Sequence, residues 1–330
     1  MSLIKNSIVV RGYLNNICLQ YNNMNYVADR VFPIIDGLSR KTKVAKMTKG
    51  AWLTDDASER APGTAAKRTQ INTTYSNLDP ITFATGVLVT DEEREDAAVP
   101  GNVPIQPDIV AMELMAQKLD LKREVRCSAE IYAANWCSVG AGGEDAEGHW
   151  GDATAANDTT VADVVKAKSA IRALTGMEPN KLLLDYVAWG GIKYAPALLG
   201  KIYGQRFGKD MTISLQQMAD FLELEEIAVM GAIKNVAEEL VDGSQFSAEN
   251  VFGASGKGVA FLYYAPSTPS TKIPSAGYQY RIRQSTGGSR KISIWREDAL
   301  HSDAYDAQEE VDISAVCLDL GYMFKDTKTN

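Results

Sequence analysis

The sequence is poor in the residues that most enzymes and metalloproteins concentrate. Its 330 residues include two histidines and four cysteines. His149 and His301 have no cysteine or second histidine at metal-ligand spacing, and no CxxC pair occurs. A Ser–His–Asp arrangement stays open, because its members can come from distant positions, but no nucleophile elbow supports it. We therefore interpret both histidines as solvated surface residues, and we expect no catalytic residue, metal or cofactor.

Long apolar runs are also missing. A membrane-spanning helix needs about 20 consecutive apolar residues, and the longest runs here, around 227–233 and 259–264, are far shorter. Residues 1–6 show no basic region followed by an apolar one, so we expect no signal peptide. These absences predict a protein made in a cytoplasm, without membrane contact, whose thiols stay reduced.

Positive charge is in deficit. The chain has 34 basic and 42 acidic residues, which gives a net charge of −8. A nucleic-acid binder normally presents a basic face, because neutralisation of phosphates drives its affinity. The composition therefore argues against sequence-specific binding of nucleic acid. A hydrophobic fraction of 45% still allows a sizeable folded core.

Some short segments are similar in composition to known functional sites. Segment 253–258 (GASGKG) departs from a phosphate-binding loop in its glycine spacing and lacks the Ser or Thr after the lysine, so it favours a flexible turn. Acidic clusters at 55–56 and 91–96 are typical of solvated faces, whereas a glycosidase needs two carboxylates about 5–10 Å apart in a cleft. Aromatic residues at alternating strand positions are more typical of a core or an interface than of a ligand platform. They are Tyr263, Tyr264, Tyr278, Tyr280 and Trp295.

The front of the chain shows little regular pattern. Residues 1–50 predict an extended arm with one short helix near residues 21–29. Residues 64–90 predict a long hairpin, in which strand 67–75 turns at 77–80 and returns as strand 81–89. The first of these strands has few apolar residues, and a lone hairpin is marginally stable in water. Something outside the hairpin must therefore hold it.

Residues 107–136 carry the strongest helical pattern. Pro107 suits the first helical position, and Asp108 suits the first turn. Such a helix would be about 40 Å long, at about 1.5 Å per residue, which is typical of a spine rather than of a compact bundle. We expect two stripes along it. One comprises Ile109, Met112, Ala116 and Leu119, and the second comprises Leu114, Leu121, Val125, Ser128 and Tyr132.

The second half combines both kinds of pattern. After a loop rich in Gly, Ala and Asp at 138–160, residues 160–235 alternate helix and strand, with Gly176 ending one helix and Ser214 beginning another. Residues 258–298 are rich in strands.

Two of these strands, 278–283 and 291–295, have the spacing of a hairpin around Gly287 and Gly288. A last strand is expected at 311–317.

A set of short segments, in order along most of the chain, resembles one group of tailed-bacteriophage major capsid proteins. These proteins share the Hong Kong 97 fold with herpesvirus capsid floors and encapsulins. Each segment is weakly specific alone, but the ordered set is more so. The segments are 28–33 (ADRVFP), 59–63 (ERAPG), 90–94 (TDEER), 175–180 (TGMEPN), 258–266 (GVAFLYYAP), 275–280 (SAGYQY) and 320–322 (LGY).

The resemblance implies an α+β, Hong Kong 97-like major capsid fold with four parts. They are an N-terminal arm (1–50), an extended β-hairpin loop (51–90), a peripheral domain (91–137 and 258–298) with its spine helix (107–136), and an axial α/β domain (138–257 and 299–330).

It also implies a structural protein rather than an enzyme. Such a protein assembles into pentamers and hexamers of an icosahedral shell around double-stranded DNA, in the virion, after assembly in the host cytoplasm. Its partners would be further copies of itself, a portal, a scaffold and decoration proteins. A mildly acidic shell would repel DNA phosphates and let the genome slide. The alternatives are an encapsulin-like nanocompartment and, from another class, an α/β or glycosidase-type enzyme.

Contacts between subunits would be made by apolar residues of the arm and loop and by opposite charges on neighbouring segments. The candidates are Val31, Phe32, Arg60, Lys67, Arg68, Ile71, Tyr75, Ile81, Phe83, Glu92, Glu93 and Glu95. Lys67 is also a possible partner for the Lys–Asn crosslink of some relatives, but no motif supports that chemistry.

Overall fold

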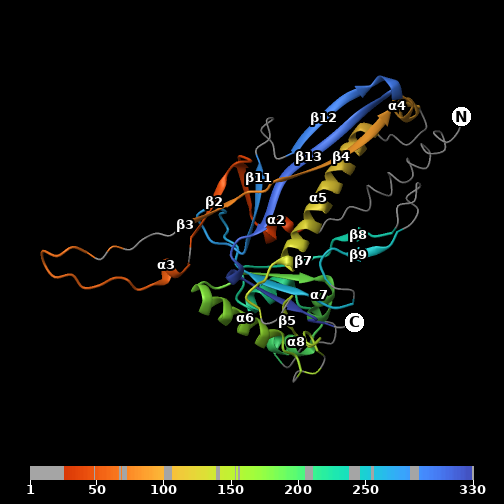
Figure 1. Ribbon diagram of the computed structural model, residues 1–330. Helices are drawn as coiled ribbons and strands as arrows, with labels where there is room; N and C mark the ends of the chain where they lie inside the picture. Colours follow the sequence, from red (N-terminus) through yellow and green to blue (C-terminus); the bar gives the residue numbers. More distant parts are fainter. Residues whose placement is uncertain are drawn as a thin grey trace.

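Two five-stranded sheets and one long helix organise the molecule. The computed structural model describes residues 26–47, 49–66, 68, 73–99, 106–138, 142–152, 154, 157–204, 211–237, 246–253, 256–282 and 290–328. Figure 1 shows one sheet drawn out along the long helix, a second sheet surrounded by shorter helices, and a loop that projects to one side.

The helices of the described residues are α2 (Ala28–Val31), α3 (Lys49–Leu53), α4 (Asp91–Ala98), α5 (Pro107–Ala133), α6 (Thr160–Thr175), α7 (Tyr186–Lys193), α8 (Pro196–Tyr203) and α9 (Leu215–Phe221). The strands are β1 (Ile34–Leu38), β2 (Lys43–Met47), β3 (Thr73–Asn77), β4 (Ile81–Thr90), β5 (Glu144–Asp145), β6 (Lys181–Asp185), β7 (Glu226–Met230), β8 (Ile233–Asn235), β9 (Ala248–Asn250), β10 (Ala260–Tyr263), β11 (Gly277–Ile282), β12 (Arg290–Glu297), β13 (Ser302–Ala315) and β14 (Gly321–Lys325).

The elongated sheet is built around β13, its longest strand. β13 pairs antiparallel with β4, with β12 and with β11, and β1 adds to β11 in parallel. Side chains on β4 alternate, so that Phe83, Val87 and Val89 face α5 while their neighbours face away. α5 covers this face of the sheet through Met115 and Leu119.

The helix α5 begins at Pro107, as its sequence predicts, and ends at Ala133. Its buried residues repeat about every four positions and are Ala111, Met115, Leu119, Arg123, Glu124, Cys127, Ser128 and Ile131. The expected apolar face is only partly buried, because Ile109 is 50% and Met112 is 37% exposed. The face was misplaced because the helical period alone cannot say which of two apolar stripes meets the sheet.

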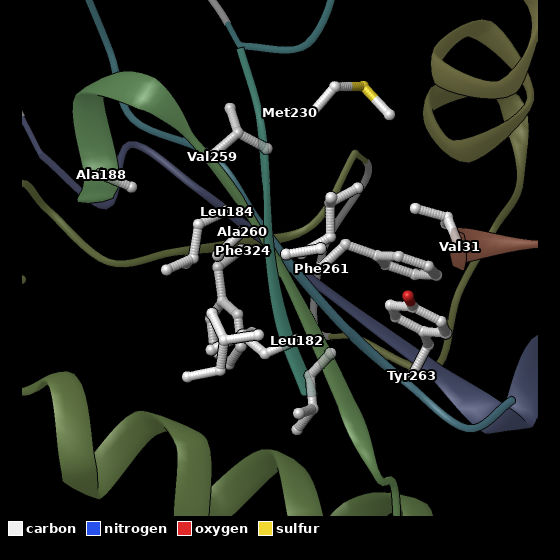
Figure 2. Packing of buried hydrophobic residues seen from close by; sticks show 14 of the residues in the cluster. Val31, Leu182, Leu184, Ala188, Met230, Val259, Ala260, Phe261, Tyr263 and Phe324 are labelled. Carbon is white, nitrogen blue, oxygen red and sulfur yellow. The ribbon is translucent and has the colours of Figure 1, made fainter. Parts of the chain in front are cut away.

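The compact sheet has the order β5-β14-β10-β6-β7. Its central strands are apolar on both faces, which is typical of a sheet covered on both sides. Figure 2 shows this core, in which Phe261 stacks on Tyr263 and Val31 of α2 approaches both rings. α6 ends at Gly176, whose φ of +71° is the left-handed conformation that glycine adopts without strain, as expected.

The predicted hairpin between 67–75 and 81–89 is wrong. β3 pairs with β2, and β4 pairs with β13. The physical reason is that β4 has an apolar face for α5 to cover, whereas β3 does not, so β4 joins the large sheet. The extended loop is therefore the segment between β2 and β3, of which residues 49–66 and 68 are described. Residues 67 and 69–72 of the predicted first strand lie outside the described residues.

The predicted hairpin between β11 and β12 is also wrong, because both strands pair with β13 instead. Only the end of β13 was recognised in the sequence, so its role as the shared partner was missed. The predicted division of the strands between the two domains also differs from the sheets. β10 was grouped with 258–298 and β13 with 299–330, but β10 lies in the compact sheet and β13 in the elongated one.

Candidate functional site

The described part of the extended loop, residues 49–66 and 68, is largely exposed. It includes α3 and projects to one side of the body (Figure 1). Residues 57–66 are all exposed, and Leu53 at the end of α3 is 63% exposed. An ion pair from Lys49 to Asp319 ties the base of the loop to the body. The loop thus leaves apolar and charged side chains without cover from its own subunit.

The predicted contact residues of this loop are only partly described. Arg60 and Arg68 are exposed, as expected of residues that contact another molecule. Lys67 and Ile71 lie outside the described residues. Tyr75, on β3 where the loop returns, is 68% exposed.

The outer face of the elongated sheet carries a second apolar surface. Leu88 of β4 and Trp295 of β12 both pair with Ala304 and so lie on the same side of the sheet, opposite α5. They are 46% and 47% exposed. Ile292 and Ile294 are exposed at the β12 edge on the other side. Exposed apolar side chains on both faces of one sheet end are typical of a surface that another molecule covers.

The two remaining apolar candidates behave differently. Ile81, at the beginning of β4, is half exposed. Phe83 is half-buried, and the guanidinium of Arg126 lies 4.4 Å from the centroid of its ring. Phe83 therefore contributes to the packing of α5 against the sheet, and Ile81 remains available for contact.

The acidic helix α4 lies at the same end of the sheet. Thr90 and Glu93 form a capping box, with both hydrogen bonds at 3.3 Å, so the Glu93 side chain is engaged in capping the beginning of the helix. Glu92 and Glu95 are exposed. The sequence interpretation of 91–96 as a solvated face missed this helix, although the Thr-x-x-Glu spacing was a readable signal.

A network around Arg94 fixes α4 to the sheet and to α5. The guanidinium lies 2.7 Å from Asp108 and 2.6 Å from Asp303, and the Tyr305 hydroxyl donates to Asp108 at 2.7 Å. Hydrogen bonds from Arg94 hold the pKa of both carboxyl groups below its usual range. The exposed end of the sheet is therefore a rigid surface rather than a loose one.

Val31 and Phe32 were wrongly predicted to be exposed for contacts between subunits. Both are fully buried within their own chain. Phe32 lies so close to β11 that a Cβ added at Gly277 would be 2.5 Å from its ring. The front segment showed no period in the sequence, and its cover comes from strands and helices far along the chain.

The structure also buries charges that the sequence interpretation did not single out. Arg123 of α5 lies 2.9 Å from Asp29 and 2.9 Å from Glu309, and it joins α2 and β13 to the helix. Glu124 beside it is fully buried, and burial raises its pKa to about 7. The available signal was the interruption of an apolar helical face by charged residues.

Lys257 and the two histidines, which the sequence offered as possible site residues, are at least partly exposed. The side chain of Lys257, in the glycine-rich segment, pairs with Asp326. His301 is exposed, and His149 is 39% exposed at its side chain. Within the described residues there is no group of three metal-binding side chains, and no helix is both long and apolar enough to cross a membrane.

A hollow of about 340 Å³ lies between α6 and α9, and three of its charged side chains, Lys168, Arg172 and Glu178, have partners. Arg172 pairs with Glu178 at 3.0 Å, and Lys168 donates to the Leu222 carbonyl at 2.6 Å. Glu223 is then the one lining carboxylate of the hollow for which the described residues show no ion pair, whereas the glycosidase alternative requires two carboxylates that converge.

Comparison with known proteins places this geometry in context. No protein-family model matches the chain. The major capsid protein of Burkholderia phage BcepMu is 23% identical over 233 residues, which cover 68% of this chain and 70% of that protein. The crystal structure of a phage-related protein from Bordetella bronchiseptica matches 96% of both chains, with a TM-score of 0.64 and 22% identity.

A capsid structure of cyanophage P-SCSP1u matches 88% of this chain and 84% of its own, with a TM-score of 0.51 and 11% identity. The mixed α+β fold is therefore similar to phage capsid folds, and the resemblance that the sequence predicted is confirmed. These comparisons support the function of a capsid shell subunit.

Proposed function

We propose that the chain is the major capsid protein of a tailed bacteriophage. Copies of it would form the pentamers and hexamers of an icosahedral shell around double-stranded DNA. The observation that carries the proposal is the extended loop, in which residues 57–66 are all exposed. A protein that acts alone gains no stability from such a segment, whereas a shell subunit can bury it against a neighbour.

The Hong Kong 97-like parts would follow the sheets rather than the sequence boundaries. The elongated sheet with α5 would be the peripheral domain and its spine helix. The compact sheet with α6 to α9 would be the axial domain. The segment from β2 to β3 would be the extended loop that reaches over a neighbour, and the chain ahead of β1 would be the N-terminal arm.

Opposite charges would orient neighbouring subunits. Arg60 and Arg68 on the loop are exposed, as are Glu92 and Glu95 on α4. Charge complementarity fixes the orientation of a contact more than its affinity. Leu53, Leu88 and Trp295 would supply the apolar area around these charges.

No catalytic role is part of the proposal, and the protein would reside in the virion after assembly in the host cytoplasm. A portal, a scaffold and decoration proteins would be further partners. The net charge of −8 would keep the inner wall from binding DNA tightly. Strong binding of DNA by the purified protein at physiological salt would contradict this last point.

The direct test is the assembly state of the full-length protein. Size-exclusion chromatography and negative-stain microscopy should show capsomers or closed shells. A variant in which a short Gly/Ser linker replaces residues 57–66 should fold, because the linker leaves both five-stranded sheets intact. It should remain unassembled, because it lacks the segment that a neighbouring subunit would bury. A wild-type protein that stays smaller than a pentamer, or a linker variant that builds normal shells, would overturn the proposal.

The encapsulin-like alternative shares the shell and differs in its contents. Particles purified from infected cells should hold DNA. An enclosed enzyme in place of DNA would favour the nanocompartment.

A further inference from the structure

The helix α2 is held on the body by a buried carboxylate. Glu124, on α5, accepts hydrogen bonds from the backbone N–H groups of Val27 at 2.9 Å and Ala28 at 2.8 Å. These N–H groups stand at the beginning of α2, where the helix itself offers them no acceptor. The side chain of Glu124 therefore completes a helix that is 97 positions away in the sequence.

Other contacts hold α2 on its remaining sides. Gln279 of β11 donates to the Ala28 carbonyl at 2.8 Å, and Arg123 donates to Asp29 at 2.9 Å. Phe32 packs against Gly277. Segment 26–32 is thus seated between α5 and β11.

This seat has an electrostatic cost, because Glu124 is removed from water. Burial raises its pKa to about 7, although the bonds from Val27 and Ala28 and the charge of Arg123 oppose the shift. The titratable and charged groups around the seat come from several elements. They are Asp29 and Arg30 on α2, Asp120, Arg123 and Cys127 on α5, Arg281 on β11 and Glu309 on β13.

We propose that Glu124 is a latch that holds segment 26–32 on the body and loosens as the solution becomes more alkaline across the neutral range. When α2 leaves its seat, Glu124 meets water and regains the ordinary pKa of a glutamate, about 4.5. The seated form then binds the proton more tightly than the released form, so protonation favours the seated form. The neutral acid keeps one carbonyl oxygen to accept from an N–H group of α2.

The sign of the effect follows from these two values. The seated form is most favoured below about pH 4.5, and this advantage is lost as the pH rises through about 7. The ratio of seated to released α2 should therefore be about tenfold lower at pH 8 than at pH 6. The latch works within one subunit, so it holds or fails independently of the shell function.

Hydrogen exchange of peptide 26–32 in the full-length protein tests the latch, after correction for the intrinsic pH dependence of exchange. The wild-type protection factor should be about tenfold lower at pH 8 than at pH 6. Glu124→Gln keeps one acceptor but cannot ionise, so its protection factor should be equal at both values. Glu130→Gln is the matched control on the same helix, and it should retain the wild-type behaviour.

The outcomes that overturn the latch are distinct. Equal wild-type protection at pH 6 and pH 8 would exclude it, whether or not the Glu124→Gln variant folds. A folded Glu124→Gln variant that kept the wild-type dependence would assign the effect to another group.

Discussion

Asp185 shows how a single buried side chain makes stability depend on pH. It caps α7 by accepting from the Ala188 N–H at 2.6 Å. The residue is fully buried, and its second carboxylate oxygen has no hydrogen-bond partner among the described residues. Burial raises its pKa to about 6, above the unfolded value of 3.8, although backbone N–H groups oppose the shift. Its stabilising contribution is therefore greatest below about pH 3.8 and is lost as the pH rises through 6.

Asp185→Asn should consequently change stability by different amounts at different pH. Asparagine remains a good helix cap but does not ionise. Between pH 5 and pH 8, the free energy of unfolding of the variant relative to wild type should move in favour of Asn by about 1 kcal/mol. Urea unfolding of unassembled protein at both values measures it. Asp185→Ala, which loses the cap, should be destabilised at both values, and a constant difference for Asn would contradict the assignment.

A substitution at Gly277 tests how tightly the ring of Phe32 is packed. Gly277→Ala should destabilise the subunit by about 1–3 kcal/mol, because the added Cβ meets a buried ring that has no room to move. Gly50→Ala is the control, since a Cβ there would have no atom within 4 Å. Thermal unfolding compares the two variants. Equal effects would mean that Phe32 adapts and that α2 is more loosely packed than its burial indicates.

At the scale of elements, α5 joins the two sheets. Its first half covers the elongated sheet, and its second half enters the core that contains β10. Arg123 stands between these halves and binds α2 and β13. Because a single helix spans both cores, a break in it should affect both.

Ala116→Pro should therefore be far more damaging than Ala116→Gly. Proline removes a helical hydrogen bond and costs about 3 kcal/mol or more, whereas glycine costs about 1 kcal/mol. Circular dichroism and the yield of assembled particles measure the difference. Wild-type yield from the proline variant would show that assembly does not need a continuous α5.

At the scale of the whole molecule, the exposed charges predict how copies meet. Reversal of both loop arginines, Arg60→Glu with Arg68→Glu, should reduce assembly, and Glu92→Arg with Glu95→Arg should do the same. Combining the four changes should restore part of the assembly, because the attraction is then re-formed with opposite signs. Glu93 is left unchanged, since it caps α4.

Particle yield by light scattering at low and high salt measures this contact. The rescue should weaken as salt rises, because exposed charges are screened within about 10 Å at 0.1 M. A combined variant that assembles no better than either parent would show that these charges do not meet.

The sequence by itself determined the features that depend on neighbours along the chain. The beginning of α5 at Pro107, the end of α6 at Gly176 and the cap of α9 at Ser214 each rest on a few adjacent residues. Arg60 and Arg68 were likewise predicted to lie at the surface, as charged residues available to neighbouring subunits, and both are exposed.

Only the tertiary structure decided which strands pair and which polar or apolar groups are covered. β4, β11 and β12 all pair with the edges of β13. These pairings stand in place of the two hairpins that the sequence predicted between strands adjacent in the chain. Val31 is buried, and Glu124 caps α2, because elements far along the chain close around them. Such contacts depend on the sum of burial over distant segments, which no local pattern contains.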